Sequence, residues 1–151
     1  MVPHWCASRR IFLSVVGTTV AGAPLLACSS AVPEPENIGQ VDAGLASSYP
    51  VGSLEAIGNL AVALGHDAGG FYALTLTCTH QGCNMAVQGA VSGAGIACAC
   101  HGATYTVNGT VRGGPAKADL THFAVKIDPA TGAITIDGTT RVSASARTPA
   151  V

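Results

Sequence analysis

Two short segments rich in cysteine and histidine constrain this chain more than any other feature of its sequence. The first is Cys-Thr-His-Gln-Gly-Cys at residues 78–83, and the second is Cys-Ala-Cys-His-Gly-Ala at residues 98–103. Together they contain four of the six cysteines and two of the five histidines in 151 residues. Each segment therefore offers thiolate and imidazole groups at a spacing suited to one shared metal centre.

A set of two cysteines and two histidines has two common uses. It can hold zinc in a tetrahedral site, or it can hold a [2Fe-2S] cluster in which two histidines replace two cysteines on one iron. Zinc fingers usually take their histidine pair from a helix, whereas here each glycine-rich segment carries both residue types. Two cysteines would also be left over in a zinc site. The spacing favours the iron–sulfur cluster, with zinc as the alternative.

The two segments resemble the cluster loops of high-potential Rieske iron–sulfur proteins. The resemblance extends to Tyr105 and to Gly114-Pro115, and it covers roughly residues 70–137. It implies an all-β, Rieske-type fold of small antiparallel sheets, with a cluster-binding subdomain built from the two Cys/His loops. It also implies one [2Fe-2S] cluster per chain, used for one-electron transfer.

The resemblance assigns a role to each cysteine and histidine of the two loops. Cys83 and Cys100 would form a disulfide between the loops, a pair that the Rieske domains of ring-hydroxylating oxygenases and their ferredoxins lack. The iron ligands would be one cysteine and one histidine from each loop: Cys78, His80, Cys98 and His101. In the family, sulfur binds one iron and the histidines bind the other.

Three glycines and one proline are expected around the cluster. Gly82 and Gly102 lie in the two loops, where glycine lets backbone N–H groups approach the cluster sulfurs closely. Gly114-Pro115 matches the proline loop that covers the cluster in the family. In quinol-oxidising relatives, Leu commonly stands at the position of Gln81, and a second Pro often stands at the position of Lys117. Both differences disfavour a tight fit to an apolar quinol pocket.

Two positions bear on the reduction potential. Tyr105 matches a family tyrosine whose hydroxyl bonds a ligand sulfur, here expected to be that of Cys78. Ala103 stands where many high-potential members carry a serine that donates to a bridging sulfide, so one donor is missing. Histidine ligands place such clusters at roughly −150 to +300 mV, and surrounding hydrogen bonds select the value within that range.

The first 28 residues are predicted to be an export signal. The twin arginine Arg9-Arg10 precedes an apolar run from Ile11 to Ala27. Residues 25–28, Leu-Leu-Ala-Cys, resemble a lipobox, in which cleavage leaves Cys28 as a lipid-modified N-terminus. The alternative is an uncleaved transmembrane anchor. The run is at the lower edge of a bilayer span and is broken by glycine and proline, which favours cleavage.

This interpretation gives every cysteine a place and sets the compartment. Cys6 leaves with the signal and Cys28 takes the lipid, while the other four serve the cluster and the disulfide. A disulfide implies an oxidising compartment outside the cytoplasm. We therefore expect an exported protein of the bacterial cell envelope or periplasm, held at the membrane by its lipid or signal anchor. Residues 29–40 contain Pro33 and Pro35 and are predicted to be a linker.

The remaining chain is predicted to be β-structure in one Rieske domain at residues 41–140, with the cluster-binding part at about 77–116. Asn108-Gly109 is the clearest hairpin turn. Residues 141–151 are small and polar and are expected to be a frayed tail, and His66 and His122 are expected at the surface. Residues 87–98 are expected to form one hairpin, and residues 129–132 are the turn of another. Strands are expected at residues 57–64, 71–77, 104–107, 110–112, 123–128 and 133–137.

Composition narrows the function further. A net charge of −1 gives no sign of nucleic-acid binding. The chain has no Ser/His/Asp set, paired carboxylates or phosphate loop, so we expect an electron carrier or redox-enzyme subunit without its own catalytic site. The leading hypothesis is a lipid-anchored electron carrier with an unidentified redox protein as partner. The alternatives are the Rieske subunit of a quinol–cytochrome c oxidoreductase and that of a molybdenum oxidase of the arsenite type.

Overall fold

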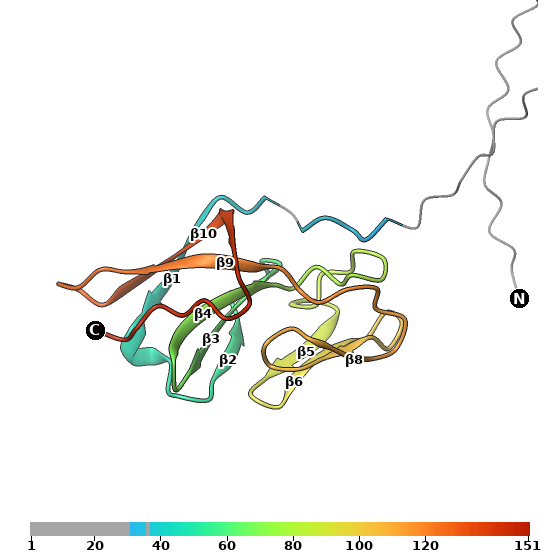
Figure 1. The fold of residues 1–151 in the computed structure, drawn as a ribbon, viewed down its shortest axis with the longest axis horizontal. Coiled ribbons are helices and arrows are strands. Elements are labelled where there is room, and N and C mark those ends of the chain that lie inside the picture. Colours follow the sequence, from blue (N-terminus) through green and yellow to red (C-terminus); the bar gives the residue numbers. More distant parts are fainter. Residues whose placement is uncertain (1–30, 36) are drawn as a thin grey trace, which may run out of the picture.

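The computed structural model describes residues 31–35 and 37–151, and these residues form an all-β protein, as predicted (Figure 1). Within them, no helix is long and apolar enough to cross a membrane. The larger sheet has six antiparallel strands in the order β1-β10-β9-β4-β3-β2. The strands are β1 (Gln40–Leu45), β2 (Leu54–Ala56), β3 (Val62–Asp67), β4 (Gly70–Thr75), β9 (His122–Ile127) and β10 (Ala133–Val142). A short 3-10 turn (Ala46–Ser48) follows β1.

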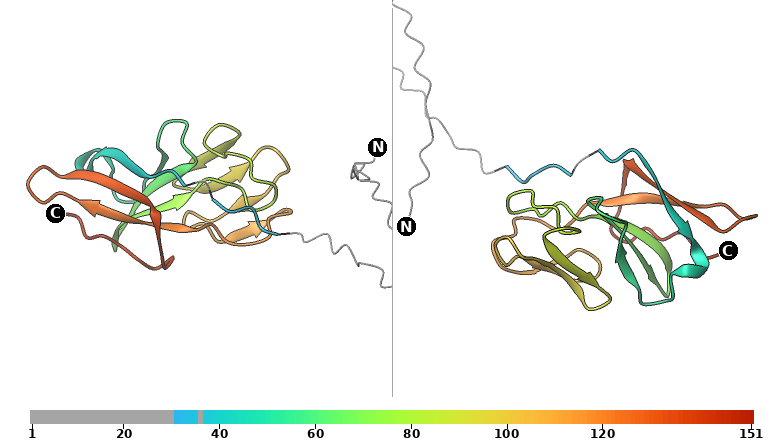
Figure 2. Two further views of the ribbon diagram at one scale, coloured as in Figure 1. Left: turned by 90° about the horizontal axis from the view of Figure 1, so that it is seen from above. Right: turned by 180° about the vertical axis from the view of Figure 1, so that it is seen from behind.

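In chain order, the strands of the smaller sheet lie between β4 and β9, which are themselves paired neighbours in the larger sheet. The smaller sheet has four antiparallel strands, in the order β5-β6-β7-β8, and lies beside the six-stranded sheet (Figure 2). The strands are β5 (Gly89–Ser92), β6 (Gly95–Cys98), β7 (Thr104–Tyr105) and β8 (Val111–Gly113). We call residues 76–121 the cluster-binding subdomain and the six-stranded sheet the base.

Hydrogen bonds within the turns close two of the predicted hairpins. Between β9 and β10, the Asp128 carboxylate accepts the N–H groups of Ala130 and Thr131 at 2.9 Å each, so an aspartate turn closes this hairpin. The expected hairpin at Asn108-Gly109 also forms, but its loop is longer than two residues. Thr106 N–H donates to Thr110 O at 2.8 Å, and the register between β7 and β8 shifts by a bulge.

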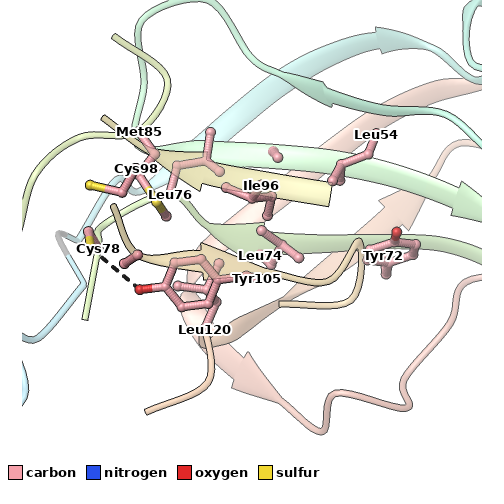
Figure 3. Packing of buried hydrophobic residues seen from close by; sticks show 12 residues of the cluster. Leu54, Tyr72, Leu74, Leu76, Cys78, Met85, Ile96, Cys98, Tyr105 and Leu120 are labelled. Carbon is pink, nitrogen blue, oxygen red and sulfur yellow. Dashed lines mark hydrogen bonds between the residues drawn. The ribbon is translucent and has the colours of Figure 1, made fainter. Parts of the chain in front are cut away.

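The two faces of the base are packed against different partners. All six residues of β4 are buried, because successive side chains of a strand point to opposite faces and both faces are covered. Phe71 and Ala73 belong to the core under β1 and β10. Tyr72 and Leu74 belong to a second core, shared with the cluster-binding subdomain (Figure 3). That second core reaches the cysteines of both Cys/His loops, so the base supports the candidate site directly.

The C-terminal tail is ordered, and the prediction of a frayed tail is wrong. Thr148 pairs with Phe71 on β4 through two backbone hydrogen bonds of 2.8 and 2.9 Å. Glycine at position 70 makes room for this pairing, because a Cβ there would lie 2.3 Å from Thr148 O. The tail is small and polar in sequence, but backbone pairing does not require large side chains.

Arg147 links the tail to both parts of the fold. Its Nε donates to Asp67 at 2.7 Å and its Nη2 donates to Asn108 Oδ1 at 2.8 Å. The guanidinium lies 4.1 Å above the ring centroid of Tyr72, a favourable cation–π distance. Because Asn108 belongs to the β7–β8 turn, this one side chain ties the base to the cluster-binding subdomain.

Neither His66 nor His122 is the surface residue that the sequence predicts. His122 is 2% exposed, and its Nε2 bonds Asn108 O at 3.0 Å. His66 is half-buried, stacks on Phe71 with ring centroids 4.0 Å apart and bonds Tyr49 O through Nδ1. His122 contacts a segment 14 residues away, whereas His66 is covered by Phe71 across the β3–β4 hairpin and by Tyr49, so local polarity did not reveal the burial of either ring.

Candidate metal centre

The two Cys/His loops close in the same way. In the first loop, Cys78 N–H donates to Cys83 O at 2.9 Å and Gly82 N–H donates to Cys78 O at 2.8 Å. The second loop has the same two bonds at the same spacings from its first cysteine, five residues for the first bond and four for the second. There, Cys98 N–H donates to Ala103 O at 2.8 Å and Gly102 N–H donates to Cys98 O at 3.0 Å. Each loop is therefore a compact turn in which both the N–H and the C=O of the first cysteine are hydrogen-bonded within the loop.

Gly82 and Gly102 shape these turns through their backbone conformation. Their φ angles are 77° and 76°, in the left-handed region that glycine adopts without steric cost. Their N–H groups bond the cysteine carbonyls just described. Both glycines thus let each loop close tightly, and their place beside the cluster stays a prediction.

The disulfide between the loops is present as predicted. Cys83 and Cys100 are bonded to each other across a sequence separation of 17. The sulfurs of Cys83, Cys98 and Cys100 all lie within 4.8 Å of one another, so the disulfide lies directly beside the site. Its two sulfurs are covalently paired and offer no thiolate. Among the described residues, the free cysteines are Cys78 and Cys98.

Cys78 and Cys98 are both buried and lie at the same end of the shared core (Figure 3). Each is 2% exposed. Burial raises the pKa of the Cys98 thiol, and the nearby Cys78 thiol also raises it, whereas the backbone N–H groups of Cys100 and His101 act to lower it. Backbone N–H groups near a ligand sulfur are the kind of donors that stabilise negative charge on a cluster ligand.

His80 and His101 come together from the two loops. Their ring centroids lie 4.7 Å apart in an edge-to-face arrangement. His101 is exposed and His80 is half-exposed. Burial, the neighbouring His101 and the positive charge of Lys117 lower the pKa of His80, in that order, which favours the neutral imidazole that binds metal. Its Nδ1 is enclosed and has no hydrogen-bond partner among the described residues, as suits a metal-binding nitrogen.

Tyr105 contacts Cys78, as predicted. Its hydroxyl lies 3.4 Å from the Cys78 sulfur (Figure 3). The same hydroxyl accepts the Thr79 N–H at 3.2 Å. Tyr105 is 1% exposed. Burial, followed by the hydrogen bond to Cys78, raises the pKa of Tyr105 to about 12. The hydroxyl therefore keeps its proton at all ordinary pH values and can donate to sulfur.

Thr79 is a structural residue that the sequence analysis missed. Its hydroxyl donates to Ala118 O at 2.7 Å and lies 3.0 Å from the Tyr105 hydroxyl. It is 4% exposed. The available sequence signal was its place between two predicted ligands, Cys78 and His80. Through Thr79, the segment after the proline loop is held against the first Cys/His loop.

The proline loop packs against the second Cys/His loop. A Cβ on Gly114 would lie 2.4 Å from Gly102 O and 2.8 Å from Ala103 Cα, and its φ is 77°. No other residue type fits this position without moving backbone. Ala103 is fully buried there, whereas Pro115 is exposed. Of the predicted site residues, Cys28 alone lies outside the described part of the chain.

Comparison with known proteins agrees with this geometry. The family model for the Rieske [2Fe-2S] domain matches residues 41–124. The cytochrome b6-f complex iron-sulfur subunit of Chlorobaculum tepidum is 32% identical over 93 residues, which are 60% of this chain and 50% of that protein. The chain thus spans about half the length of this curated relative. It belongs to the Rieske [2Fe-2S] domain family.

Two solved structures are also similar. One is a chain from the complex of reduced oxygenase and oxidized ferredoxin in carbazole 1,9a-dioxygenase, with a TM-score of 0.49, 24% identity and coverage of 72% of this chain and 100% of that one. The other is the plasma membrane Rieske protein PetC3 of the cyanobacterium Synechocystis PCC 6803, with a TM-score of 0.44, 25% identity and coverage of 64% and 98%.

The residues present fit one [2Fe-2S] cluster, and the zinc alternative is set aside by the family membership. Two buried thiols remain outside the disulfide, and two imidazoles lie edge to face with ring centroids 4.7 Å apart. When bound, such a cluster takes up and releases one electron. The chain contributes the ligands, the hydrogen bonds around them and the cover that keeps water from the sulfurs. The assignment of Cys78, His80, Cys98 and His101 as the ligands stays a prediction.

Proposed function

We propose that this protein is a one-electron carrier that exchanges electrons with a redox protein through the tip formed by His80 and His101. The observation that carries the proposal is the difference in exposure across the site. The two cysteines are 2% exposed, whereas His101 is exposed and His80 is half-exposed. Electron transfer weakens steeply with distance, so the partner's redox centre has its shortest approach at the imidazole edges.

The tip suits a protein partner better than a quinol. Gln81 and Lys117 are both exposed beside the histidines, at positions where quinol-oxidising relatives commonly carry Leu and often Pro. Burying an unpaired amide or ammonium in an apolar pocket costs several kcal/mol, on the order of 2–7 for an amide. A small, hydrated contact is usual for transient electron-transfer encounters. We therefore propose that the protein does not oxidise quinol directly.

A second function is favoured by the 32% identity to the iron-sulfur subunit of a cytochrome b6-f complex. In this alternative, the chain is a permanent subunit of a membrane complex. Gentle solubilisation of native membranes, followed by affinity purification, separates the two functions. A stable cytochrome-containing assembly would support the subunit, whereas release of the chain alone would support the mobile carrier.

The ligand assignment and the redox function are tested together with single variants. The purified protein should contain two irons and give a rhombic EPR signal on reduction. Alanine in place of Cys78, His80, Cys98 or His101 should abolish that signal. Asn84→Ala is a control, because Asn84 bonds Asn59 O outside the ligand set. Retention of an intact cluster in any ligand variant would disprove the assignment of that residue.

We also propose that the protein is exported by the twin-arginine route and anchored by lipid on Cys28, outside the cytoplasm. The supporting observations are the Arg9-Arg10 pair, the lipobox-like segment and the disulfide in the folded domain. Replacing both arginines by lysine should leave the precursor in the cytoplasm, and Cys28→Ala should block lipid attachment. Mass spectrometry of the mature N-terminus tests this proposal. A mature chain that retains residues 11–27 would favour the transmembrane anchor instead.

A further inference from the structure

Charged residues are distributed unevenly over the described part of the molecule. The cluster-binding subdomain carries three of them: Arg112, Lys117 and Asp119. The linker and base carry acidic residues over several elements: Glu34, Asp42, Glu55, Asp67, Asp128 and Asp137. Their basic residues are Lys126, Arg141 and Arg147. The base is therefore acidic, while the subdomain that presents the histidines has a slight excess of positive charge.

Two ion pairs each neutralise one basic and one acidic residue and leave the net negative charge of this part unchanged. Arg141 pairs with Glu34 at 2.5 Å and Arg147 pairs with Asp67 at 2.7 Å. Of the three basic residues described outside the cluster-binding subdomain, Lys126 is the one that forms neither of these ion pairs. Hydrogen bonds from the backbone and then the side chain of Thr131 lower the pKa of the Asp128 carboxyl. Those from the side chain and then the backbone of Thr139 lower the pKa of the Asp137 carboxyl, so both groups stay ionised. The acidic end of the molecule thus keeps its charge over the physiological range.

Lys117 is fixed beside the histidine tip by the backbone. The next residue, Ala118, shares two contacts with the Thr79 hydroxyl, through its O at 2.7 Å and its N at 3.4 Å. Thr79 directly precedes His80 and Ala118 directly follows Lys117, so these two contacts hold the chain at Lys117 beside the chain at His80.

Asp119 does not cancel this charge at the tip. Its carboxylate accepts the backbone N–H of Val111 on β8 at 2.9 Å, so it is held by that strand. Among the described residues, the tip has no large exposed aliphatic or aromatic side chain, and its exposed apolar residue is Pro115. The described exposed large hydrophobic residues lie outside both loops and outside residues 114–118: Val32, Leu45, Val51, Leu60, Val87 and Val151. Recognition at the tip is therefore left to charge and hydrogen bonds.

We propose that the histidine tip docks on an acidic face of the partner protein, with Lys117 as the main recognition residue. This inference rests on the proposed electron-carrier function and names the partner's chemistry. At physiological ionic strength the Debye length is about 8 Å, so charges at the contact outweigh those at the remote end. At low salt, the acidic base and the basic tip would also turn the molecule so that the tip faces an acidic partner.

The test measures electron transfer to two chemically matched probes. Cytochrome c is basic, and its succinylated form carries carboxylates in place of its lysine amines. In each reaction the reduced protein loses one electron and the ferric haem gains it. Stopped-flow rates would be measured for wild type, Lys117→Glu and Lys126→Glu at several ionic strengths. Lys126 is exposed on β9 of the base, so Lys126→Glu makes the same charge change away from the tip.

We expect Lys117→Glu to slow reduction of succinylated cytochrome c by about three- to tenfold and to speed that of cytochrome c, whereas Lys126→Glu changes either rate less than twofold. The wild-type rate with the succinylated probe should fall as salt rises. Equal effects of the two variants, or a wild-type rate that is indifferent to salt, would overturn the acidic-partner inference. If Lys117→Glu loses its cluster by EPR, Lys117→Gln replaces it.

The outcomes also separate this inference from the proposed function. If wild type transfers no electrons to either probe although its EPR signal and potential permit it, the carrier function fails as well. If wild type reacts rapidly with both probes but the Lys117 variant matches the Lys126 variant, the carrier function stands and the acidic docking face is rejected.

Discussion

Replacing Tyr105 by phenylalanine removes one hydroxyl from the candidate cluster site and should lower its midpoint potential. The hydroxyl lies 3.4 Å from the Cys78 sulfur and is the side-chain hydroxyl that the structure places against that ligand. With a pKa of about 12, it stays protonated at pH 6–9. A hydrogen bond to a ligand sulfur favours the reduced state, because the reduced cluster carries more negative charge.

The size of the shift follows from the difference between two hydrogen bonds. A bond to a charged acceptor contributes about 1.5–3 kcal/mol and a neutral one about 0.5–1.5 kcal/mol, so the reduced state gains roughly 1 kcal/mol more from this hydroxyl. A tenfold change in equilibrium constant, about 1.4 kcal/mol, is 59 mV for one electron. The variant's potential should therefore lie about 40 mV below that of wild type. The buried Thr79 N–H also loses its acceptor, which should cost about 1–3 kcal/mol of stability.

The assay is a redox titration followed by EPR or visible circular dichroism, with urea unfolding for stability. Tyr72→Phe is the matched control, because Tyr72 is 4% exposed and its hydroxyl donates to Val107 O at 3.2 Å, away from the cysteines. The control should lose stability without a change in potential. An unchanged potential in Tyr105→Phe, or an equal shift in both variants, would refute the assigned hydrogen bond to Cys78.

Three further changes have defined outcomes. Cys83→Ser opens a cross-link over 17 residues, which should cost about 3 kcal/mol and release the cluster more readily on heating; equal cluster half-lives would contradict this. Ala103→Ser restores a hydroxyl at a fully buried position and should raise the potential, so an unmoved value would show that the hydroxyl has no path to the cluster. Burial acts to raise the pKa of Asp67, but hydrogen bonds from Arg147 and Gly69 lower it overall. Because the folded pKa is below the unfolded value of about 3.9, this stability is present above about pH 4 and is lost as pH falls through the folded pKa. Arg147→Met should therefore destabilise the domain more at pH 7 than at pH 3 in urea unfolding; an equal loss at both would assign its effect to packing alone.

The linear sequence determined the features that depend on neighbouring residues. Both Cys/His loops close within five residues of their first cysteine, so the spacing of Cys, His and Gly was enough to predict a metal centre and the paired loops around it. The hairpin at residues 129–132 was predicted for the same reason, since Asp128 bonds N–H groups two and three residues later. The fold class followed from these turns and from the alternating strands between them.

Only the tertiary structure decided the features that join distant segments. The Tyr105 hydroxyl reaches Cys78 across 27 residues and Arg147 reaches Asp67 across 80, and no local pattern records either contact. The burial of His122 and the ordered tail share this origin, because each is covered by another element rather than by its own neighbours. Gly82 and Gly102 combine both kinds of information. Their place in the loops followed from the sequence, but only the folded backbone showed that their N–H groups bond cysteine carbonyls. Hydrogen bonds between close residues are encoded by spacing, whereas those between remote residues form only when packing of the whole chain brings donor and acceptor together.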